Sequence, residues 1–519
     1  MRTATLTLLL ALAACEQRTP PPSPPTQTAP PQTATTAVPK PMEAGEAPPP
    51  VTPPIDRDLP AIAQSGDLKV IFTFNSTGYF LYRGDTMGYE YELLSRFAAE
   101  SKLKLKAVVA RDSDELFARL NAGDGDVVAA QLAATTNISQ VAETHALYET
   151  APVVVQRSAK EPDANTTPAV STAMEREERE TSPSPIEVRA RLVNTPAELA
   201  GRPVHVPRTS PYRPRLLELN DELTQDIEVV EVDETSDHLI ERLAEGDIAY
   251  TVAAENLAAL KAGEYSNLII KPQIGPAQPI VWALRRNAPQ LLAALNRWID
   301  AKRKSGLLAV LYRKYFLDRR GFQKRSQSRY LTTETGTLSP YDDWFREYAS
   351  IPGWDWRLVA SQAFQESRFN PSARSWAGAA GLMQIMPRTA RQLRVNPADP
   401  RQSVEGACRY LWSLDDQLKD VVPSETERIK FILGAYNVGL GHIQDAQRLA
   451  KKYGDDPKSW ADVGYWLIRK SKRAVYNDPV VRHGFCRGTE PVAYVDQIVA
   501  RWDNYREFVP NAPNAEPLD

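Results

Sequence analysis

Glu366 is the residue of this 519-residue chain that is best placed to do chemistry. Apolar residues at helical spacing predict a helix that Asp355 caps and that ends just beyond Glu366, because Asn370-Pro371 cannot easily continue it. The C-terminal end of a helix is already negative, and apolar neighbours raise the pKa of a carboxyl group further. A lone glutamate at a helix end is usually a solvated surface charge, but this combination suits a general acid that works near neutral pH.

Three blocks of the sequence, at residues 366–390, 435–439 and 490–495, contain side chains that suit a sugar ligand. Amides and hydroxyls offer donors and acceptors to sugar hydroxyls, methionine gives a soft apolar wall, and tyrosine joins an apolar face to a polar tip. Glycine lets the backbone approach a ligand closely. The predicted substrate-binding residues are Ser375, Gly381, Met383, Gln384, Tyr436, Asn437, Glu490 and Tyr494. The alternative is that Met383 and Tyr436 belong to the core and that the glycines form turns.

The three blocks, in this order over about 130 residues, resemble the soluble-lytic-transglycosylase family, which has a lysozyme-like fold. The resemblance implies that peptidoglycan glycan strands are the substrate and that the MurNAc-GlcNAc β-1,4 bond is cleaved. Glu366 would act alone, first as acid on the leaving oxygen and then as base on the 6-hydroxyl, and would leave a 1,6-anhydro-MurNAc end. The N-acetyl group of the substrate would be the nucleophile, and Glu490 would support the cleft.

Two alternatives to this activity stay open. Retaining and inverting glycosidases ordinarily use two carboxyl groups, so a hydrolytic muramidase would need a second one. The second alternative is a wall-binding lipoprotein that has kept the fold of the catalytic domain but not its activity. The intact Glu366 with all three blocks favours the lytic enzyme.

The middle of the chain alternates strands and helices, which predicts parallel sheets. Residues 88–92, 123–126 and 194–201, with a helical pair broken at Gly306, resemble the periplasmic amino-acid-binding protein family. That resemblance implies two α/β lobes joined by a hinge, with a ligand cleft between them. The module would regulate or position the catalytic domain.

The resemblance also indicates that the ligand of this module is unusual. Gln140 stands where the family has an arginine for the ligand carboxylate, and a neutral amide cannot form that charged pair. The family's aspartate for the ligand amine falls at Ala254 or beside it, next to Glu255. We therefore expect a peptide, a muropeptide or no ligand rather than a free amino acid.

The N-terminus predicts export and lipidation. A positive start and a short apolar core precede Leu12-Ala13-Ala14-Cys15, which resembles a bacterial lipobox in which Cys15 takes the lipid. An ordinary signal peptide with an incidental cysteine is the alternative. Glu16, rather than aspartate, follows Cys15 and favours the periplasmic face of the outer membrane of a Gram-negative bacterium. The next segment, 20–54, has 14 prolines in 35 residues and predicts an extended tether.

Composition excludes several other classes of protein. The formal net charge of −3 argues against a nucleic-acid binder, and there is no run of eighteen apolar residues that could span a membrane. Three cysteines are too few for a disulfide scaffold or a cysteine-built zinc site, and no cofactor or metal is expected. Cys408 and Cys486 could form a disulfide in an oxidising periplasm or stay free thiols.

The predicted fold class is a multidomain chain with an α/β two-lobe periplasmic-binding-protein-like module, followed by a mainly α lysozyme-like domain. The expected partners are glycan strands, a peptide ligand of the module and the membrane through the lipid. The expected segments are a signal peptide at 1–14, a lipidated tether at 15–60, lobe 1 at 61–157 and 272–320, a disordered insertion at 158–190, lobe 2 at 191–271, the catalytic domain at 321–509 and a tail at 510–519.

Overall fold

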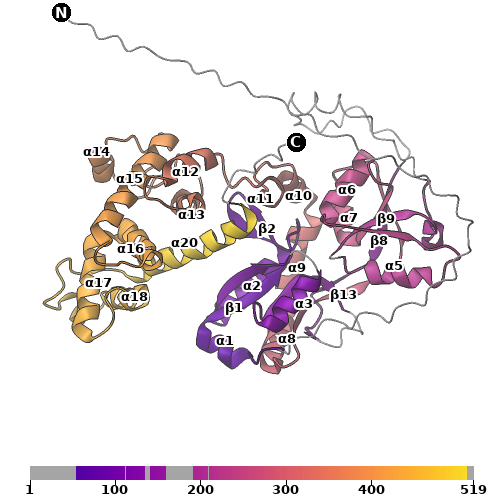
Figure 1. Cartoon of the computed structure of the whole chain (residues 1–519), viewed down its shortest axis with the longest axis horizontal. Coiled ribbons are helices and arrows are strands. Elements are labelled where there is room, and N and C mark those ends of the chain that lie inside the picture. Colours follow the sequence, from indigo (N-terminus) through magenta and orange to yellow (C-terminus); the bar gives the residue numbers. More distant parts are fainter. Residues whose placement is uncertain (1–53, 111–112, 135–140, 159–190, 209, 511–519) are drawn as a thin grey trace, which may run out of the picture. The chain divides into compact units, whose positions relative to one another are not determined.

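The first α/β lobe is built on a sheet in the order β4-β1-β5-β13-β6, with β7 also paired to β13. β1 runs parallel to β4 and β5, as the sequence predicts, whereas β13 pairs antiparallel with β5, β6 and β7. Figure 1 shows helices against this sheet. The elements of the lobe are α1 (Leu59–Ser65), β1 (Asp67–Phe72), β2 (Phe80–Tyr82), β3 (Asp85–Met87), α2 (Tyr89–Glu100), β4 (Lys104–Val109), α3 (Ser113–Ala122), β5 (Val127–Ala133), β6 (Val141–Glu143), β7 (Tyr148–Thr150), β13 (Gln278–Arg285), α8 (Pro289–Lys304), α9 (Leu307–Tyr312) and a π-helical turn, η2 (Arg313–Leu317).

This computed structural model describes residues 54–110, 113–134, 141–158, 191–208 and 210–510. The predicted signal peptide with Cys15, most of the tether, Gln140 and nearly all of the 158–190 insertion lie outside these residues.

The second lobe has a sheet in the order β10-β9-β11-β8-β12. Strand β8, between its antiparallel neighbours β11 and β12, carries Val153, Val154 and Val155, which are all buried. The sequence placed this segment in lobe 1, but a strand that is apolar on both faces is stable only inside a covered sheet, and β8 finds that place in lobe 2. The elements are β8 (Pro152–Arg157), η1 (Pro196–Leu199), β9 (Pro203–Pro207), α5 (Arg213–Asn220), β10 (Glu228–Val232), α6 (Ser236–Glu245), β11 (Tyr250–Ala254), α7 (Glu255–Lys261) and β12 (Leu268–Gln273).

The fold begins earlier than the predicted end of the tether at residue 60. Arg57 forms an ion pair with Asp126 at 2.9 Å, and Asp126 also pairs at 3.0 Å with Arg285. The side chains of Asp126 and Arg285 are completely buried, so each charge needs the other. Asp58 caps α1 and also accepts hydrogen bonds from backbone N–H groups at the start of α8. Charged side chains therefore anchor the segment that the proline content assigned to the tether.

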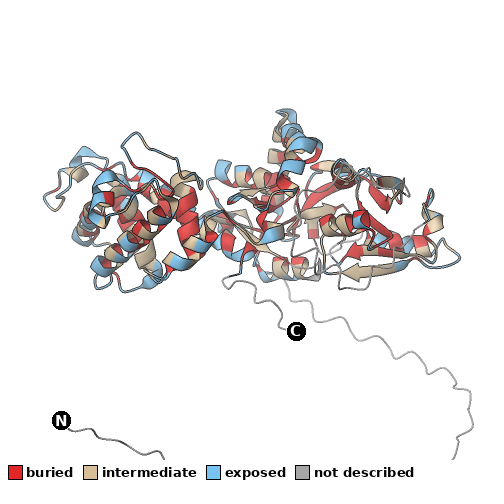
Figure 2. Cartoon of the chain, turned by 90° about the horizontal axis from the view of Figure 1, so that it is seen from above, coloured by how far each residue is buried: buried red, intermediate tan, exposed pale blue. Residues whose placement is uncertain are grey.

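The remainder of the described chain is helical, as the sequence predicts. Helix α13 lies at its centre, and every residue of α13 from Trp356 to Phe364 is buried. Figure 2 shows buried residues along the strands of the lobes and along the inner helices of this domain. The helices are α10 (Arg319–Ser326), α11 (Thr332–Thr335), α12 (Asp342–Ala349), α13 (Trp356–Ser367), α14 (Pro387–Leu393), α15 (Pro400–Leu418), α16 (Glu425–Val438), α17 (Leu440–Tyr453), α18 (Trp460–Arg469), α19 (Arg473–Tyr476) and α20 (Thr489–Phe508).

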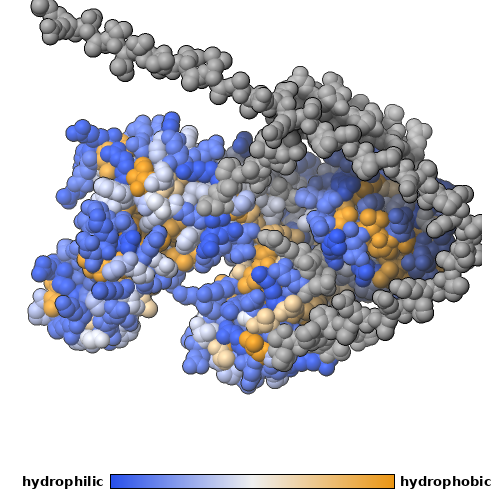
Figure 3. All heavy atoms as spheres, in the orientation of Figure 1, coloured by the Kyte–Doolittle hydropathy of each residue, from blue (hydrophilic) through white to orange (hydrophobic). Residues whose placement is uncertain are grey.

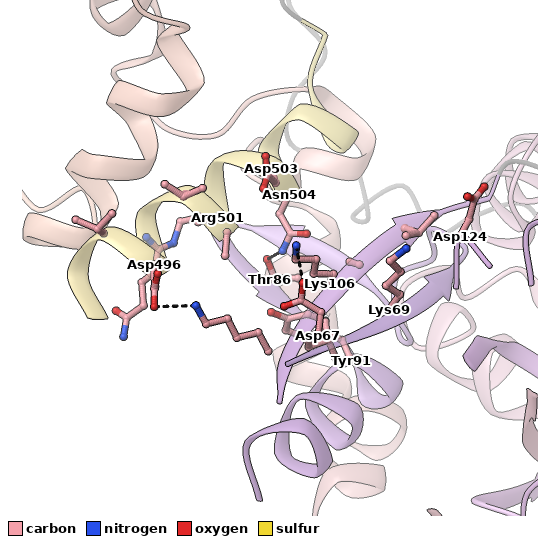
Figure 4. A pocket seen from close by; sticks show the side chains of 18 of the residues that line it. Asp67, Lys69, Thr86, Tyr91, Lys106, Asp124, Asp496, Arg501, Asp503 and Asn504 are labelled. Carbon is pink, nitrogen blue, oxygen red and sulfur yellow. Dashed lines mark hydrogen bonds and ion pairs between the residues drawn. The ribbon is translucent and has the colours of Figure 1, made fainter. Parts of the chain in front are cut away.

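Helix α20 contacts both the catalytic domain and the first lobe. Near its C-terminal end, the Tyr505 hydroxyl donates to the Gly84 carbonyl at 2.8 Å, and the Phe508 ring lies 4.3 Å from that of Phe74. Figure 4 shows a groove between α20 and strands β1 and β4, where Lys104 pairs with Asp496 at 2.9 Å. Helix α20 thus packs against the helices of the catalytic domain and also against the first lobe.

The structure also bears on the surface of the protein and on the state of its two described cysteines. The face in Figure 3 is mostly hydrophilic, with separate hydrophobic patches, and no described helix is long and apolar enough to cross a membrane. Of the two alternatives that the sequence left open for Cys408 and Cys486, the structure has the free thiols, and both are buried. Cys408 is packed in the core along α15, whereas Cys486 lies in the loop before α20 in the electrostatic range of Lys470.

Candidate active site

Helix α13 brings Glu366 to the place that the sequence predicts. The Asp355 side chain caps the helix by accepting from the Arg357 N–H at 2.9 Å, and the helix ends at Arg368 in the left-handed conformation with φ 51°. Glu366 therefore stands in the last turn, and its side chain has intermediate exposure. The buried helix thus fixes the base of the side chain, while the side chain as a whole stays partly exposed.

The environment of Glu366 suits a proton donor near neutral pH. Burial raises the pKa of Glu366 to about 7, while a hydrogen bond from Tyr494 acts in the opposite direction. The Tyr494 hydroxyl donates to Glu366 Oε1 at 2.5 Å, and Tyr494 itself is only 6% exposed. Residues 128 positions apart in the sequence thus form the centre of the site, and both were predicted.

Two further tyrosines lie next to this pair. Tyr436 was predicted, and its hydroxyl donates to the Met383 carbonyl at 2.7 Å. Burial, and after it the negative charge of Glu366, raise the pKa of Tyr436. The ring of Tyr410, on α15, lies 5.5 Å from that of Tyr436. Tyr410 was not predicted, because nothing in its local pattern distinguishes it from other half-buried helix residues.

A rigid turn carries Ser375 and Gln384 beside these helices. Ser375 Oγ accepts from the Ala379 N–H at 3.0 Å, and Gln384 Nε2 donates to the carbonyls of Ala373 and Gly381 at 3.0 and 2.8 Å. Gln384 adopts φ 46°, a conformation that non-glycine residues take only when their surroundings hold them in it. The Gln384 amide therefore uses its donors to fix the turn, which leaves its oxygen for a ligand.

Two predicted substrate-binding residues have another role in the structure. A side chain at Gly381 would stand 1.7 Å from the Pro397 carbonyl, so glycine is required by packing within the protein rather than by a sugar. Met383 is completely buried, so it cannot form an apolar wall for substrate. It contributes through its backbone, which donates to Ser403 Oγ and accepts from Tyr436. Spacing alone does not reveal the direction in which loop residues point.

Asn437 and Glu490 lie at the surface. Asn437 is near the end of α16 and Glu490 is in the first turn of α20, and both side chains are exposed. Neither forms a hydrogen bond with Glu366, whose described partner is Tyr494. A contact of either residue with substrate remains a prediction.

The turn that contains Ser375 also presents an exposed aromatic ring. Trp376 is 100% exposed, and Met386, at the far end of the same loop, is 44% exposed. The backbone around Trp376 is ordered by hydrogen bonds, since the Ser375 N–H donates to the Ala379 carbonyl and the Gly378 N–H donates to the Ser375 carbonyl. Trp376 was not among the substrate-binding residues predicted from the sequence.

The two α/β lobes enclose a second candidate site, a cleft of about 940 Å³. The Ser76 hydroxyl of lobe 1 donates to Asp237 of lobe 2 at 2.6 Å, so a buried hydrogen bond bridges the cleft. The cleft arginines already have carboxylate partners: Arg119 pairs with Glu115 and Arg208 pairs with Asp233.

Neither of the two positions predicted to hold a ligand amine places a carboxylate in the lining of this cleft. Ala254 lines the cleft, whereas Glu255 is exposed at the start of α7 and is not part of the lining. Other carboxylates, among them Asp237 and Glu507, do line the cleft, so it offers partners for an amine, whereas both described lining arginines are already paired and are not free for a ligand carboxylate.

Comparisons with known proteins agree with this division of the chain. Residues 72–318 match the model of bacterial extracellular solute-binding proteins, family 3, and residues 343–458 match the transglycosylase SLT domain. A membrane-bound lytic murein transglycosylase F from Desulfosudis oleivorans is 30% identical over 85% of this chain and 90% of its own length. One from Shewanella pealeana is 32% identical over 82% of each chain.

The chain belongs to the membrane-bound lytic murein transglycosylase F family. Solved structures similar to its first half include a variant of ArgBP from T. maritima, with a TM-score of 0.39, 20% identity and coverage of 50% of this chain and 98% of that one. Another is AbpA from Streptococcus pneumoniae, with a TM-score of 0.39, 16% identity and coverage of 50% and 99%.

Tyr494 lies beyond the SLT match, which ends at residue 458. In this member of the transglycosylase F family, the site is therefore completed by a helix that the domain model does not cover. The contact between α13 and α20 brings Tyr494 back to Glu366.

The raised pKa of Glu366 makes the stability of the catalytic domain depend on pH. The folded state holds a proton up to about pH 7, whereas the ordinary pKa is 4.5, so folding is favoured by protonation and loses stability as pH rises between these values. We expect Glu366→Gln, which carries no ionisable group, to unfold at a higher temperature than the wild type at pH 8. The corresponding increase in the free energy of unfolding is up to about 3 kcal/mol.

Calorimetry of the full chain at pH 5 and pH 8 measures this effect. The gain should fall to less than about 1 kcal/mol at pH 5, because only part of the unfolded-state carboxyl is ionised there. Glu490→Gln is the control, because it makes the same chemical change at an exposed carboxylate. An equal gain for Glu366→Gln at both pH values would contradict the assignment of a buried proton to Glu366.

Proposed function

We propose that this protein is a peptidoglycan lytic transglycosylase in which Glu366 is the only catalytic carboxyl group. The observation that carries the proposal is the environment of Glu366. Burial raises the pKa of Glu366, the Tyr494 hydroxyl donates to its carboxyl group, and no hydrogen bond joins Glu366 to a second carboxyl group among the described residues. A pair of catalytic carboxylates at the separations used by glycosidases would perturb each other.

The reaction follows from one proton that moves twice. Protonated Glu366 gives its proton to the oxygen of the MurNAc-GlcNAc β-1,4 bond as that bond breaks. The N-acetyl group of MurNAc attacks the anomeric carbon and balances the charge. Ionised Glu366, stabilised by the Tyr494 hydroxyl, then removes the proton of the 6-hydroxyl, whose oxygen displaces the N-acetyl group. The product is a 1,6-anhydro-MurNAc end, and Glu366 is again protonated without any water consumed.

The alternative of a hydrolytic muramidase requires a base that activates water. Glu490 was the first candidate for this second carboxylate, but it is exposed in the first turn of α20. The position of Glu490 therefore favours the mechanism with one carboxyl group over hydrolysis.

Trp376 is proposed to extend the substrate-binding surface. Exposing a whole indole ring to water is unfavourable, and a rigid turn keeps this ring exposed beside Ser375. A flat aromatic face packs against the apolar face of a sugar ring, which makes a glycan strand a suitable occupant. Ser375 and Gln384 supply polar groups on the same loop.

The α/β module is proposed to bind a peptide or muropeptide and to regulate the catalytic domain. Its cleft is lined by hydroxyl groups and by the tyrosines Tyr148 and Tyr212, and its arginines are paired. Phe74 and Glu507 both belong to that lining, and Phe74 packs against Phe508 of α20. The same helix carries Tyr494 about 21 Å away, at 1.5 Å per residue. A change at the cleft could therefore reach the catalytic acid through one helix.

The predicted lipid anchor completes the proposal. Lipidation at Cys15 and a proline-rich tether would hold the enzyme at the periplasmic face of the outer membrane, within reach of the cell wall. This part of the proposal rests on the sequence, since residues 1–53 lie outside the described structure. Labelling with a radioactive fatty acid would test it, and loss of the label in Cys15→Ser is the expected result.

Glu366→Gln tests the mechanism directly. The amide keeps the shape of the side chain but has no proton to donate, so release of fragments from purified sacculi should fall by at least about 10²-fold. Mass spectrometry of the wild-type products should find fragments lighter than hydrolysed muropeptides by one water. Reducing ends in the wild-type digest would instead establish hydrolysis, and substantial activity of the variant would refute the role of Glu366.

Trp376→Ala tests the sugar platform. Loss of a stacked indole typically costs more than 1 kcal/mol, so KM for solubilised glycan strands should rise about tenfold while kcat changes little. Trp412→Ala is the matched control, because Trp412 is also exposed, 54%, but stands two residues from Tyr410 and thus on the other side of α15. Similar KM values for wild type and Trp376→Ala would exclude the platform.

Titration with the stem peptide of murein tests the ligand of the module. The peptide should bind the full chain in calorimetry and change the rate of sacculus cleavage, whereas free arginine should do neither, because the cleft arginines are already paired. Tight binding of arginine with no response to the peptide would show that the module kept the ordinary amino-acid ligand.

A further inference from the structure

Gln362 is a buried amide of α13 that lies next to the buried Ser361, whose hydroxyl is already bonded to the Ile498 carbonyl. It is completely buried, and its neighbours Leu358, Val359 and Ala363 are aliphatic and equally buried. A polar side chain in such a place costs free energy unless its hydrogen bonds are made. Gln362 precedes Glu366 by four residues, so the two side chains leave the helix on the same face.

The amide of Gln362 reaches the catalytic acid through Tyr494. Gln362 Nε2 donates to the Tyr494 hydroxyl oxygen at 3.3 Å, and that hydroxyl donates to Glu366 Oε1 at 2.5 Å. The three groups form a chain in which every proton points towards the carboxylate. This polarity matches ionised Glu366, and donation to the tyrosine oxygen makes its O–H a stronger donor.

The amide oxygen of Gln362 is the unusual part of the arrangement. Gln362 Oε1 is buried and has no hydrogen-bond partner among the described residues. An unmade hydrogen bond at a buried carbonyl is unfavourable, so a state in which this oxygen accepts a hydrogen bond is within reach when a donor becomes available. Rotation of the amide by half a turn supplies that state, because it brings Oε1 to the Tyr494 hydroxyl in place of Nε2.

The second state fits the other protonation state of the acid. When Glu366 holds its proton, it can donate to the Tyr494 oxygen, and the Tyr494 proton is then free to turn to an acceptor. A rotated Gln362 offers that acceptor. An aliphatic side chain at position 362 could serve neither state.

We propose that Gln362 is a positioning residue for the catalytic acid, whose amide turns with the protonation state of Glu366 and keeps the Tyr494 hydroxyl hydrogen bonded in both. This inference rests on the proposed role of Glu366. It adds that the strength of the acid is set by a residue that never touches substrate. The titratable groups that face Glu366 are Tyr494 of α20 and Tyr436 of α16, with Tyr410 and Cys408 of α15 behind Tyr436.

Gln362→Met is the test, since methionine has nearly the same volume but no amide. Both protonation states lose a hydrogen bond, but the ionised state loses more because hydrogen bonds that lead to a charged acceptor are stronger, so the pKa of Glu366 rises. The alkaline limb of the pH profile of kcat should move to higher pH, and kcat at its plateau should fall about fivefold to tenfold, because a weaker acid gives up its proton less readily. KM should stay unchanged, because Gln362 is completely buried.

A double-mutant cycle with Tyr494→Phe separates positioning from a structural effect. In the Tyr494→Phe background, Gln362→Met should cause no further change in kcat or in the pH profile, because the amide acts only through the hydroxyl. An equal loss in both backgrounds would mean that Gln362 supports the fold of α13, and an unshifted pH profile would overturn the proposal. Glu366→Gln, measured alongside, identifies a failure of the proposed function, because only then would that variant remain active.

Discussion

The hydrogen bond between Tyr494 and Glu366 determines how the catalytic domain must be built. It joins α13 to α20, two helices separated by more than a hundred residues, and it can form only if both are held rigidly. The buried surface of α13 provides that rigidity on one side, and packing of α20 against α13 and α16 provides it on the other. Tyr436 then closes the site by linking α16 to the loop at Met383.

In the loop that follows Glu366, most residues fix the shape of the backbone and only a few side chains are exposed. Gly381 and Gln384 take left-handed conformations, and their constraints come from contacts inside the protein. Only a few side chains of the loop are well exposed to solvent, and Trp376 is the most exposed of them. A sequence motif of this kind therefore encodes mainly a loop shape, and only a few of its members meet the ligand.

Much of the architecture was predictable from the sequence. Strands β1, β4, β5, β9, β10 and β11, the break at Gly306 and the helix that ends just beyond Glu366 followed from periodicity and capping residues, which act over a few positions. Other features depend on contacts between distant segments, and no local pattern encodes them. The place of β8 in the second sheet, the roles of Gln362 and Tyr410 and the free thiols of the two cysteines are of this kind.

The ion pairs of Asp126 with Arg57 and Arg285 have a mechanical consequence. Arg57 is the first strongly fixed side chain of the described fold, so a pull exerted along the preceding chain enters the protein there. The load passes through Asp126 to the strands of the first lobe, whose parallel neighbours β1 and β5 share it. Helix α13 and its proton donor lie outside that line of force. With the lipid anchor proposed above, a pull on the N-terminal segment would therefore load the first lobe and not the helix that carries Glu366.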